Sequence, residues 1–113
     1  MTNIFALFRH PKELQDLTSD ELQEKILTHP VLIDVRTVRE FEAGHIAGAV
    51  SIPLGQESSV VARWPVDADV VLICKTGHRS QAAAGALLAQ GFQHISHLKG
   101  GMDAWRRSGK PIE

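Results

Sequence analysis

The chain has 113 residues, a formal net charge of −1 and a single cysteine. A domain of this size can bury a core without disulfides or metals, and its basic residues are spread along the sequence, which gives no support for nucleic-acid or membrane-surface binding. One cysteine cannot form an internal disulfide. We find neither a run of membrane-spanning length nor the features of a signal peptide. We therefore expect a cytoplasmic protein whose thiol stays reduced.

The predicted elements begin after a short N-terminal stretch. Thr18 and Glu21 have the spacing of a capping box, which predicts a helix that ends at residues 29–30. The unbroken apolar run at 31–33 predicts a strand buried on both faces. Further along we expect a helix at 38–42, a strand at 49–52, a helix at 55–64, a strand at 70–73, a helix at 80–90, a strand at 95–98 and a last helix from 100.

Strands that alternate with helices at this spacing predict an α/β sandwich with a mainly parallel central sheet. Residues 1–15 are expected to be an N-terminal extension docked on the body, and residues 16–113 to form the domain itself. No internal repeat or linker divides the chain further.

The stretch CKTGHRS places Cys74 between the predicted strand at 70–73 and the helix that follows. Ligands of parallel α/β sheets bind at the carboxyl ends of strands. A loop that curls there directs backbone N–H groups into its own concavity, and the helix dipole adds positive potential. Gly77 permits the tight curl, while Lys75 and Arg79 add charge. The pattern predicts a thiolate nucleophile that accepts a small anionic substrate.

Two other interpretations of the loop fit its residues less well. A lone cysteine after a strand is commonly a small buried hydrophobe, but such a residue needs neither a nearby glycine nor flanking cations. Cysteine phosphatases and arsenate reductases form wider bowls, because their loops are one residue longer than the four residues between Cys74 and Arg79. The shorter loop favours one extra sulfur atom on the cysteine. With no second cysteine, any adduct must be released to another molecule.

Together with several other motifs, this loop resembles the single-domain rhodaneses. The resemblance spans about residues 18–113. The motifs that carry it are Leu32-Ile33-Asp34-Val35-Arg36, Glu40-Phe41, Gly44-His45-Ile46, Gly48-Ala49, Ile52-Pro53, CKTGHRS, Gly91-Phe92, Leu98-Lys99-Gly100-Gly101 and Ala104-Trp105. It implies a three-layer rhodanese-like domain with a small, mainly parallel central sheet flanked by helices.

The resemblance implies a thiosulfate sulfurtransferase that works through a persulfide on Cys74. A donor such as thiosulfate would supply the sulfur, and cyanide, a small thiol or a thioredoxin-like thiol protein would accept it. The substrate-binding residues would be those that follow the cysteine, namely Lys75, Thr76, Gly77, His78, Arg79 and Ser80. No cofactor is expected. A persulfide carrier for one protein partner stays open as an alternative, while an inert interaction domain is disfavoured by the intact cysteine and cations.

Other polar residues are expected to support the site. Asp34 and Arg36 end a predicted strand near Cys74; we expect Asp34 to hold the loop or a helix start and Arg36 to pair with Glu40. His45 should bond backbone. His78 is given a modulating role at most.

A metal site is not expected. His94 and His97 lie three apart on a predicted strand, which puts them on opposite faces. The chain has no second cysteine, and no carboxylate cluster is seen near these two histidines in the sequence.

Overall fold

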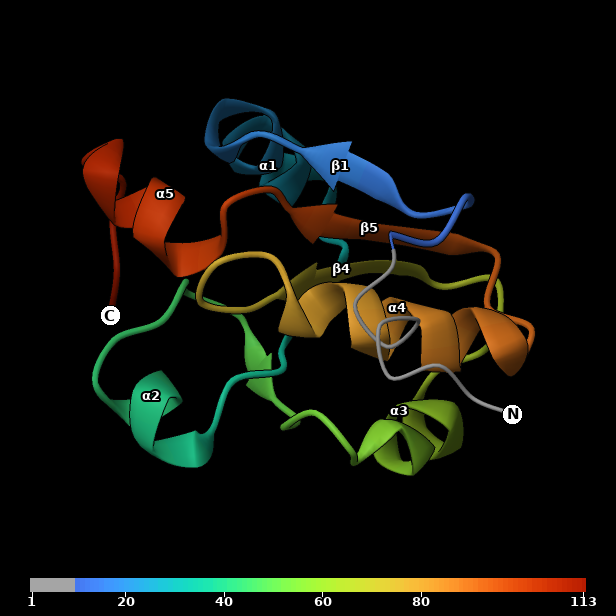
Figure 1. Cartoon of the computed structure of the whole chain (residues 1–113). Helices are drawn as coiled ribbons and strands as arrows, with labels where there is room; N and C mark the ends of the chain where they lie inside the picture. Colours follow the sequence, from blue (N-terminus) through green and yellow to red (C-terminus); the bar gives the residue numbers. More distant parts are fainter. Residues whose placement is uncertain (1–9) are drawn as a thin grey trace.

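The computed structural model describes residues 10–113 and shows one five-stranded sheet (Figure 1). Its strands are β1 (Gln15–Leu17), β2 (Val31–Asp34), β3 (Val50–Ser51), β4 (Asp69–Ile73) and β5 (His94–Leu98). They lie in the order β1-β5-β4-β2-β3, and all four pairings between neighbouring strands are parallel. The predicted parallel sheet is confirmed. Of the expected extension at 1–15, residues 1–9 lie outside the described residues, so its docking stays a prediction.

Helices cover both faces of the sheet and make three layers. On one face, α3 (Glu57–Arg63) and α4 (Arg79–Ala89) bury Val60, Ala84 and Leu87 against the strands. On the other face, α1 (Ser19–Lys25) and α5 (Gly101–Arg107) bury Leu22 and Trp105. The short α2 (Val38–Glu42) and a 3₁₀ turn (Ile26–Thr28) complete the fold. In the described part of the chain, no helix has the length and apolar character needed to cross a membrane.

Local sequence signals set several helix ends. The capping box at Thr18 and Glu21 is confirmed, because each residue bonds the other's backbone N–H. Gly91 ends the segment after α4 with φ +94°, and the Phe92 N–H donates to the Leu87 carbonyl at 3.2 Å. This hydrogen bond is the Schellman stop expected at these two residues.

The strand β1 was not predicted. Its three residues are mostly exposed and polar, so no alternation of apolar side chains marks it. It forms because Gln15–Leu17 lies parallel to β5 in direct register, with Asp16 opposite His97. Two predicted elements are shorter than expected: the second strand covers only Val50–Ser51, and α3 covers Glu57–Arg63.

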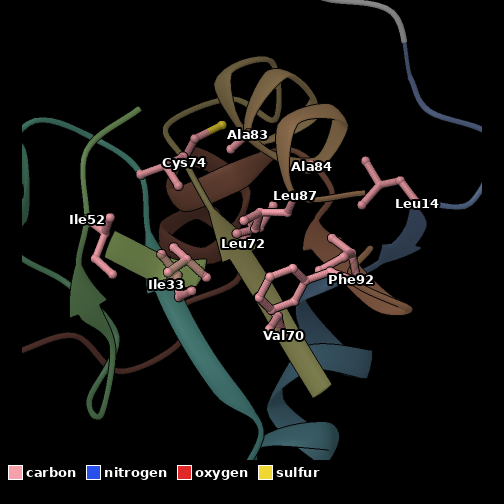
Figure 2. Close-up of a cluster of buried hydrophobic side chains, with 13 residues drawn as sticks. Leu14, Ile33, Ile52, Val70, Leu72, Cys74, Ala83, Ala84, Leu87 and Phe92 are labelled. Atoms are coloured by element: carbon pink, nitrogen blue, oxygen red, sulfur yellow. The ribbon is translucent and has the colours of Figure 1, made fainter. Parts of the chain in front are cut away.

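The alternation of side chains along β4 decides where the cysteine points. Val70 and Leu72 face the core under α4, and Cys74 follows them on that same face. Figure 2 shows the Cys74 sulfur directed toward the start of α4, above this core. The intervening Val71 and Ile73 face the opposite core with α1 and α5. Both faces of β4 are therefore buried, as a central parallel strand requires.

Candidate active site around Cys74

Cys74 lies directly after β4, at the carboxyl edge of the sheet, and its side chain is fully buried. The loop from Lys75 to His78 curls back over it. The Gly77 N–H donates to Sγ at 2.9 Å, and the Ser80 hydroxyl lies 3.5 Å from the same sulfur. Both groups can donate a hydrogen bond, so the sulfur lies among groups that stabilise negative charge.

Two glycines allow the loop to pack against the start of α5. Gly101 has φ +60°, and a Cβ there would come 2.4 Å from the Cys74 carbonyl oxygen and from Lys75 backbone atoms. The amides of α5 use this closeness: Met102 N–H donates to the Cys74 carbonyl at 2.8 Å, and Asp103 N–H donates to the Lys75 carbonyl at 3.0 Å. Gly77 adopts φ +100° in the loop itself. Gly77 and Gly101 thus allow the close contact between the cysteine loop and α5.

The two cations of the loop are both engaged in ion pairs. Arg79 makes a bidentate pair with Glu40 at 2.7 and 2.9 Å, and Lys75 pairs with Asp103 at 2.9 Å. Hydrogen bonds from Arg79 lower the pKa of Glu40 to about 2. The pKa of Arg79 is raised, first by its bond to Glu40, with the Cys74 charge among the further causes. Arg79 is therefore within electrostatic reach of the sulfur, although its guanidinium group is bound to Glu40.

The outer part of the loop presents unused donors. The backbone amides of Thr76, His78 and Arg79 have no hydrogen-bond partner within residues 10–113. The Thr76 hydroxyl and His78 Nδ1 lie 3.0 Å apart, and both residues are exposed. These amides are thus available to an anion, as expected of a loop that opens a helix.

Asp34 and Arg36 form a buried pair beside the end of β4. Arg36 donates to both Asp34 carboxylate oxygens, at 2.8 to 3.2 Å, and to the Gly44 carbonyl at 2.8 Å. The expected pairing of Arg36 with Glu40 is wrong, because Arg36 turns back to Asp34 and leaves Glu40 to Arg79. The Asp34 Oδ1 also accepts the Arg36 N–H rather than a group of the cysteine loop. A supporting role for this pair stays a proposal.

His45 bonds backbone, as expected from its turn. Its Nδ1 lies 2.9 Å from the Phe41 carbonyl, and its ring stacks on that of Phe41 at a centroid distance of 3.8 Å. This histidine organises the segment after α2.

A second set of polar residues, which the sequence analysis did not connect with the loop, lies behind Ser80. The Ser80 hydroxyl is 2.7 Å from His97 Nδ1, and His97 Nε2 is 2.7 Å from Asp16 Oδ1. His10 Nε2 lies 2.6 Å from the same Asp16 oxygen. No local sequence pattern marks this set. Its members come together because the register of β1 against β5 places Asp16 opposite His97.

Burial and neighbouring charges shift the pKa values of His97, Asp16 and His10 in different directions. Desolvation lowers the pKa of His97, and its bond to Asp16 only partly opposes this. A hydrogen bond from His10, aided by His97, lowers the pKa of Asp16. The bond to Asp16 raises the pKa of His10. Near neutral pH, Asp16 is therefore a carboxylate and the buried His97 is neutral.

One group of possible metal ligands lies at His97. The sequence shows no carboxylate cluster near His94 and His97, and the structure adds a single carboxylate there: Asp16 and His10 lie against His97, and the polar atoms of these three residues all lie within 4.8 Å of one another. Each histidine bonds the same Asp16 oxygen, Oδ1. His94 points to the other side of the strand and is exposed, as expected.

Comparison with known proteins places the chain in a family. The family model for the rhodanese-like domain matches residues 11–108. A sulfurtransferase of Allochromatium vinosum is 35% identical over 101 residues, which cover 88% of this chain and 94% of that protein. The thiosulfate sulfurtransferase GlpE of Pseudomonas entomophila is 33% identical over 76 residues, or 67% of this chain and 70% of the relative.

A solved structure from Rhodopseudomonas palustris, titled a protein of unknown function and possible tyrosine phosphatase, superposes with a TM-score of 0.82. It is 27% identical, and the match covers 99% of this chain and 95% of that one. The matched region includes all five strands and the cysteine loop, so the chain belongs to the rhodanese-like domain family.

Proposed function

We propose that the chain is a sulfurtransferase that carries a sulfane sulfur on Cys74. Thiosulfate or a similar anionic donor supplies the sulfur, and cyanide or a thiol accepts it. The observation that carries the proposal is the setting of the sulfur: Sγ accepts the Gly77 N–H at 2.9 Å and lies 3.5 Å from the Ser80 hydroxyl, at the carboxyl edge of a parallel sheet. The names of the sulfurtransferase relatives support the same chemistry.

The proposed reaction has two displacement steps. The Cys74 thiolate attacks the outer sulfur of thiosulfate; a new S–S bond forms, and the old one breaks as sulfite leaves with its electron pair. The product is a persulfide anion on Cys74. An acceptor such as cyanide then attacks the terminal sulfur, leaves as thiocyanate and regenerates the thiolate. No net electron or proton is consumed.

The backbone amides of the loop that have no partner among the described residues can stabilise the negative charge that is present in both steps. The thiolate, the donor and the persulfide are anions, and the amides of Thr76, His78 and Arg79 are free to donate to them. Cys74 itself is fully buried and the Gly77 N–H lies against Sγ, so the loop must open for a donor to reach the sulfur. We infer that donor binding and loop opening occur together.

Mass spectrometry of the intact chain tests the proposal directly. Incubation with thiosulfate should add one sulfur, about 32 Da, to Cys74, and cyanide should remove it with release of thiocyanate. Cys74→Ser should show neither the adduct nor sulfur transfer, because a hydroxyl cannot hold a stable persulfide. Circular dichroism of this variant checks that the fold is intact. Full transfer activity in Cys74→Ser would overturn the assignment.

The same experiment separates the alternatives. Turnover of a phosphate ester without any sulfur adduct would indicate a cysteine phosphatase instead. An adduct that forms with thiosulfate but passes only to a protein thiol, with little thiocyanate production, would identify a persulfide carrier. If Cys74 takes up sulfur from no donor, the domain is an interaction module.

A further inference from the structure

A line of side chains connects the buried sulfur to the protein surface. It passes from Cys74 through Ser80 and His97 to Asp16, with distances of 3.5, 2.7 and 2.7 Å. Ser80 is fully buried and His97 is 2% exposed, whereas the Asp16 side chain is 42% exposed. The line therefore starts at the nucleophile and ends at solvent.

Strand register and alternation build this line. Asp16 is directly opposite His97 on β1 and β5, and His97 is opposite Leu72 on β4. Leu72 and Cys74 share the face under α4, so His97 lies on that face too. Ser80, in the first turn of α4, occupies the space between the sulfur and the imidazole. Three strands and one helix thus position the set.

The available donors and acceptors give the line one direction. Asp16 is ionised and can only accept, so His97 Nε2 must donate to it. A neutral imidazole then has an unprotonated Nδ1, which accepts from the Ser80 hydroxyl. With its proton on His97, the Ser80 oxygen is free to accept from the Cys74 thiol. Each hydrogen bond points away from the sulfur.

We propose that His97 is the proton acceptor that converts Cys74 into a thiolate, acting through Ser80. The S–H bond breaks as its proton moves to the Ser80 oxygen, while the former Ser80 proton moves to His97 Nδ1. The imidazolium that results lies against the Asp16 carboxylate. In the new arrangement Ser80 donates to the thiolate beside the Gly77 amide. The net result is that the sulfur loses one proton and the imidazole gains one, and no other reactant is needed.

Burial of the sulfur explains why such a route is needed. A fully buried thiol cannot pass its proton to bulk water directly, and an uncompensated thiolate in the interior is costly. A cation two hydrogen bonds away offsets that cost, as it does where a histidine activates a catalytic cysteine or serine. Because the displacement steps regenerate the thiolate, the proton has to leave only once. His97 touches no substrate and is a positioning residue.

Few ionisable groups face His97 in the described part of the chain. They are Asp16 from β1, His10 from the segment before it at an edge-on ring distance of 5.5 Å, and Cys74 through Ser80. His10 Nδ1 lies 2.7 Å from the Pro11 carbonyl, and its Nε2 bonds Asp16. The bond to Asp16 raises the pKa of His10, which favours the cation in which both nitrogens donate. His10 competes with His97 for the Asp16 charge.

The inference rests on the proposed role of Cys74 but is tested without a sulfur donor. The rate of iodoacetamide alkylation is measured against pH, with EDTA present, and each profile is scaled to its own plateau so that access to the sulfur does not matter. His97→Gln keeps a polar side chain but cannot take the proton. We expect it to move the midpoint of the profile upward by about one pH unit, or about tenfold in rate near neutral pH.

Three further variants sharpen the test. Ser80→Ala interrupts the line and should move the midpoint in the same direction as His97→Gln. His10→Gln removes the competing cation and should move it slightly the other way. His94→Gln is the matched control, since it changes an exposed histidine of the same strand and should have no effect. Equal midpoints in the parent and His97→Gln would overturn the inference, while the thiosulfate adduct could still form.

Nuclear magnetic resonance of the unmutated side chain gives an independent measurement if His97→Gln does not fold. The imidazole nitrogens of His97 should change protonation together with Cys74, and this change should shift in Cys74→Ser. A His97 titration that is identical in the parent and Cys74→Ser would contradict the relay.

Discussion

The two sides of the cysteine loop differ in what their side chains contact. On the outer rim, Lys75 and Arg79 carry formal charges, and both are paired with carboxylates of other elements. On the inner side, the sulfur contacts a backbone amide and a serine hydroxyl, and the His97 imidazole lies behind that hydroxyl. The residues that look most like an anion site in the sequence are therefore the ones whose charge is already balanced.

Charge and direct contact therefore have separate roles at the site. Neutral, buried donors fix the sulfur at distances that the fold determines, while the rim cations provide a field that solvent screens. Changes to the inner side should affect the fold and the reaction strongly. Changes to the rim should alter substrate binding by smaller factors that depend on salt.

The largest effect is expected from Gly101→Ala, which disturbs the support of the inner side. A Cβ would meet the Cys74 carbonyl oxygen at 2.4 Å, and φ is +60°, so the loop must shift. We expect a loss of about 2–4 kcal/mol in the free energy of unfolding, measured in urea. Gly109→Ala is the control, because φ is +69° but nothing lies within 4 Å; it should cost about 1 kcal/mol. Equal losses would show that the close approach is unimportant.

Arg79→Ala should lower kcat/KM for thiosulfate by about tenfold, the equivalent of one charge-assisted hydrogen bond. The side chain is within electrostatic reach of Cys74, although its guanidinium binds Glu40. Glu40→Gln is the matched variant, because it leaves Arg79 in place without its counter-charge and should lower KM. If Arg79→Ala transfers sulfur as well as the parent does, the rim plays no part in donor binding.

Lys75→Ala should mainly raise the KM for thiosulfate by about two- to threefold, since Lys75 acts as a flexible charge that is shared with Asp103. Raising the salt concentration should reduce the difference from the parent, because the Lys75 side chain is 56% exposed and its charge is screened by solvent ions. Steady-state kinetics at low and high ionic strength check this. A difference that is independent of salt would point to a direct contact with the donor.

The smallest effect concerns stability in acid. The pKa of Glu40 falls from 4.5 to about 2 in the fold, mainly through Arg79. A depressed pKa contributes stability above pH 4.5 that disappears as the pH falls toward 2. The pair is 30% exposed, so we expect at most about 1 kcal/mol. Urea unfolding of the parent and Glu40→Gln should therefore differ at pH 6 and converge near pH 2; a constant difference would contradict the assignment.

Much of the fold could be predicted because its signals are local. The apolar runs at 31–33 and 70–73 became β2 and β4, and the capping box at Thr18 and the stop at Gly91 have the expected bonds. The strand β1 was missed because three polar edge residues carry no periodic pattern. The pairing of Arg36 was wrong because a side chain at a strand end can reach several carboxylates, and packing selects one of them.

The order of residues along the chain is enough to predict that one cysteine follows a buried strand and precedes a helix, and that a glycine lets the loop between them curl. These properties depend on neighbouring residues, so they can be read along the chain. The partners of the residues around the sulfur, in contrast, come from distant parts of the chain and are seen only in the folded molecule. Asp16 lies 81 residues from His97, Glu40 lies 39 from Arg79, and Asp103 lies 28 from Lys75. Such contacts arise from strand register and helix packing, which depend on the burial of the whole core rather than on any short stretch of sequence.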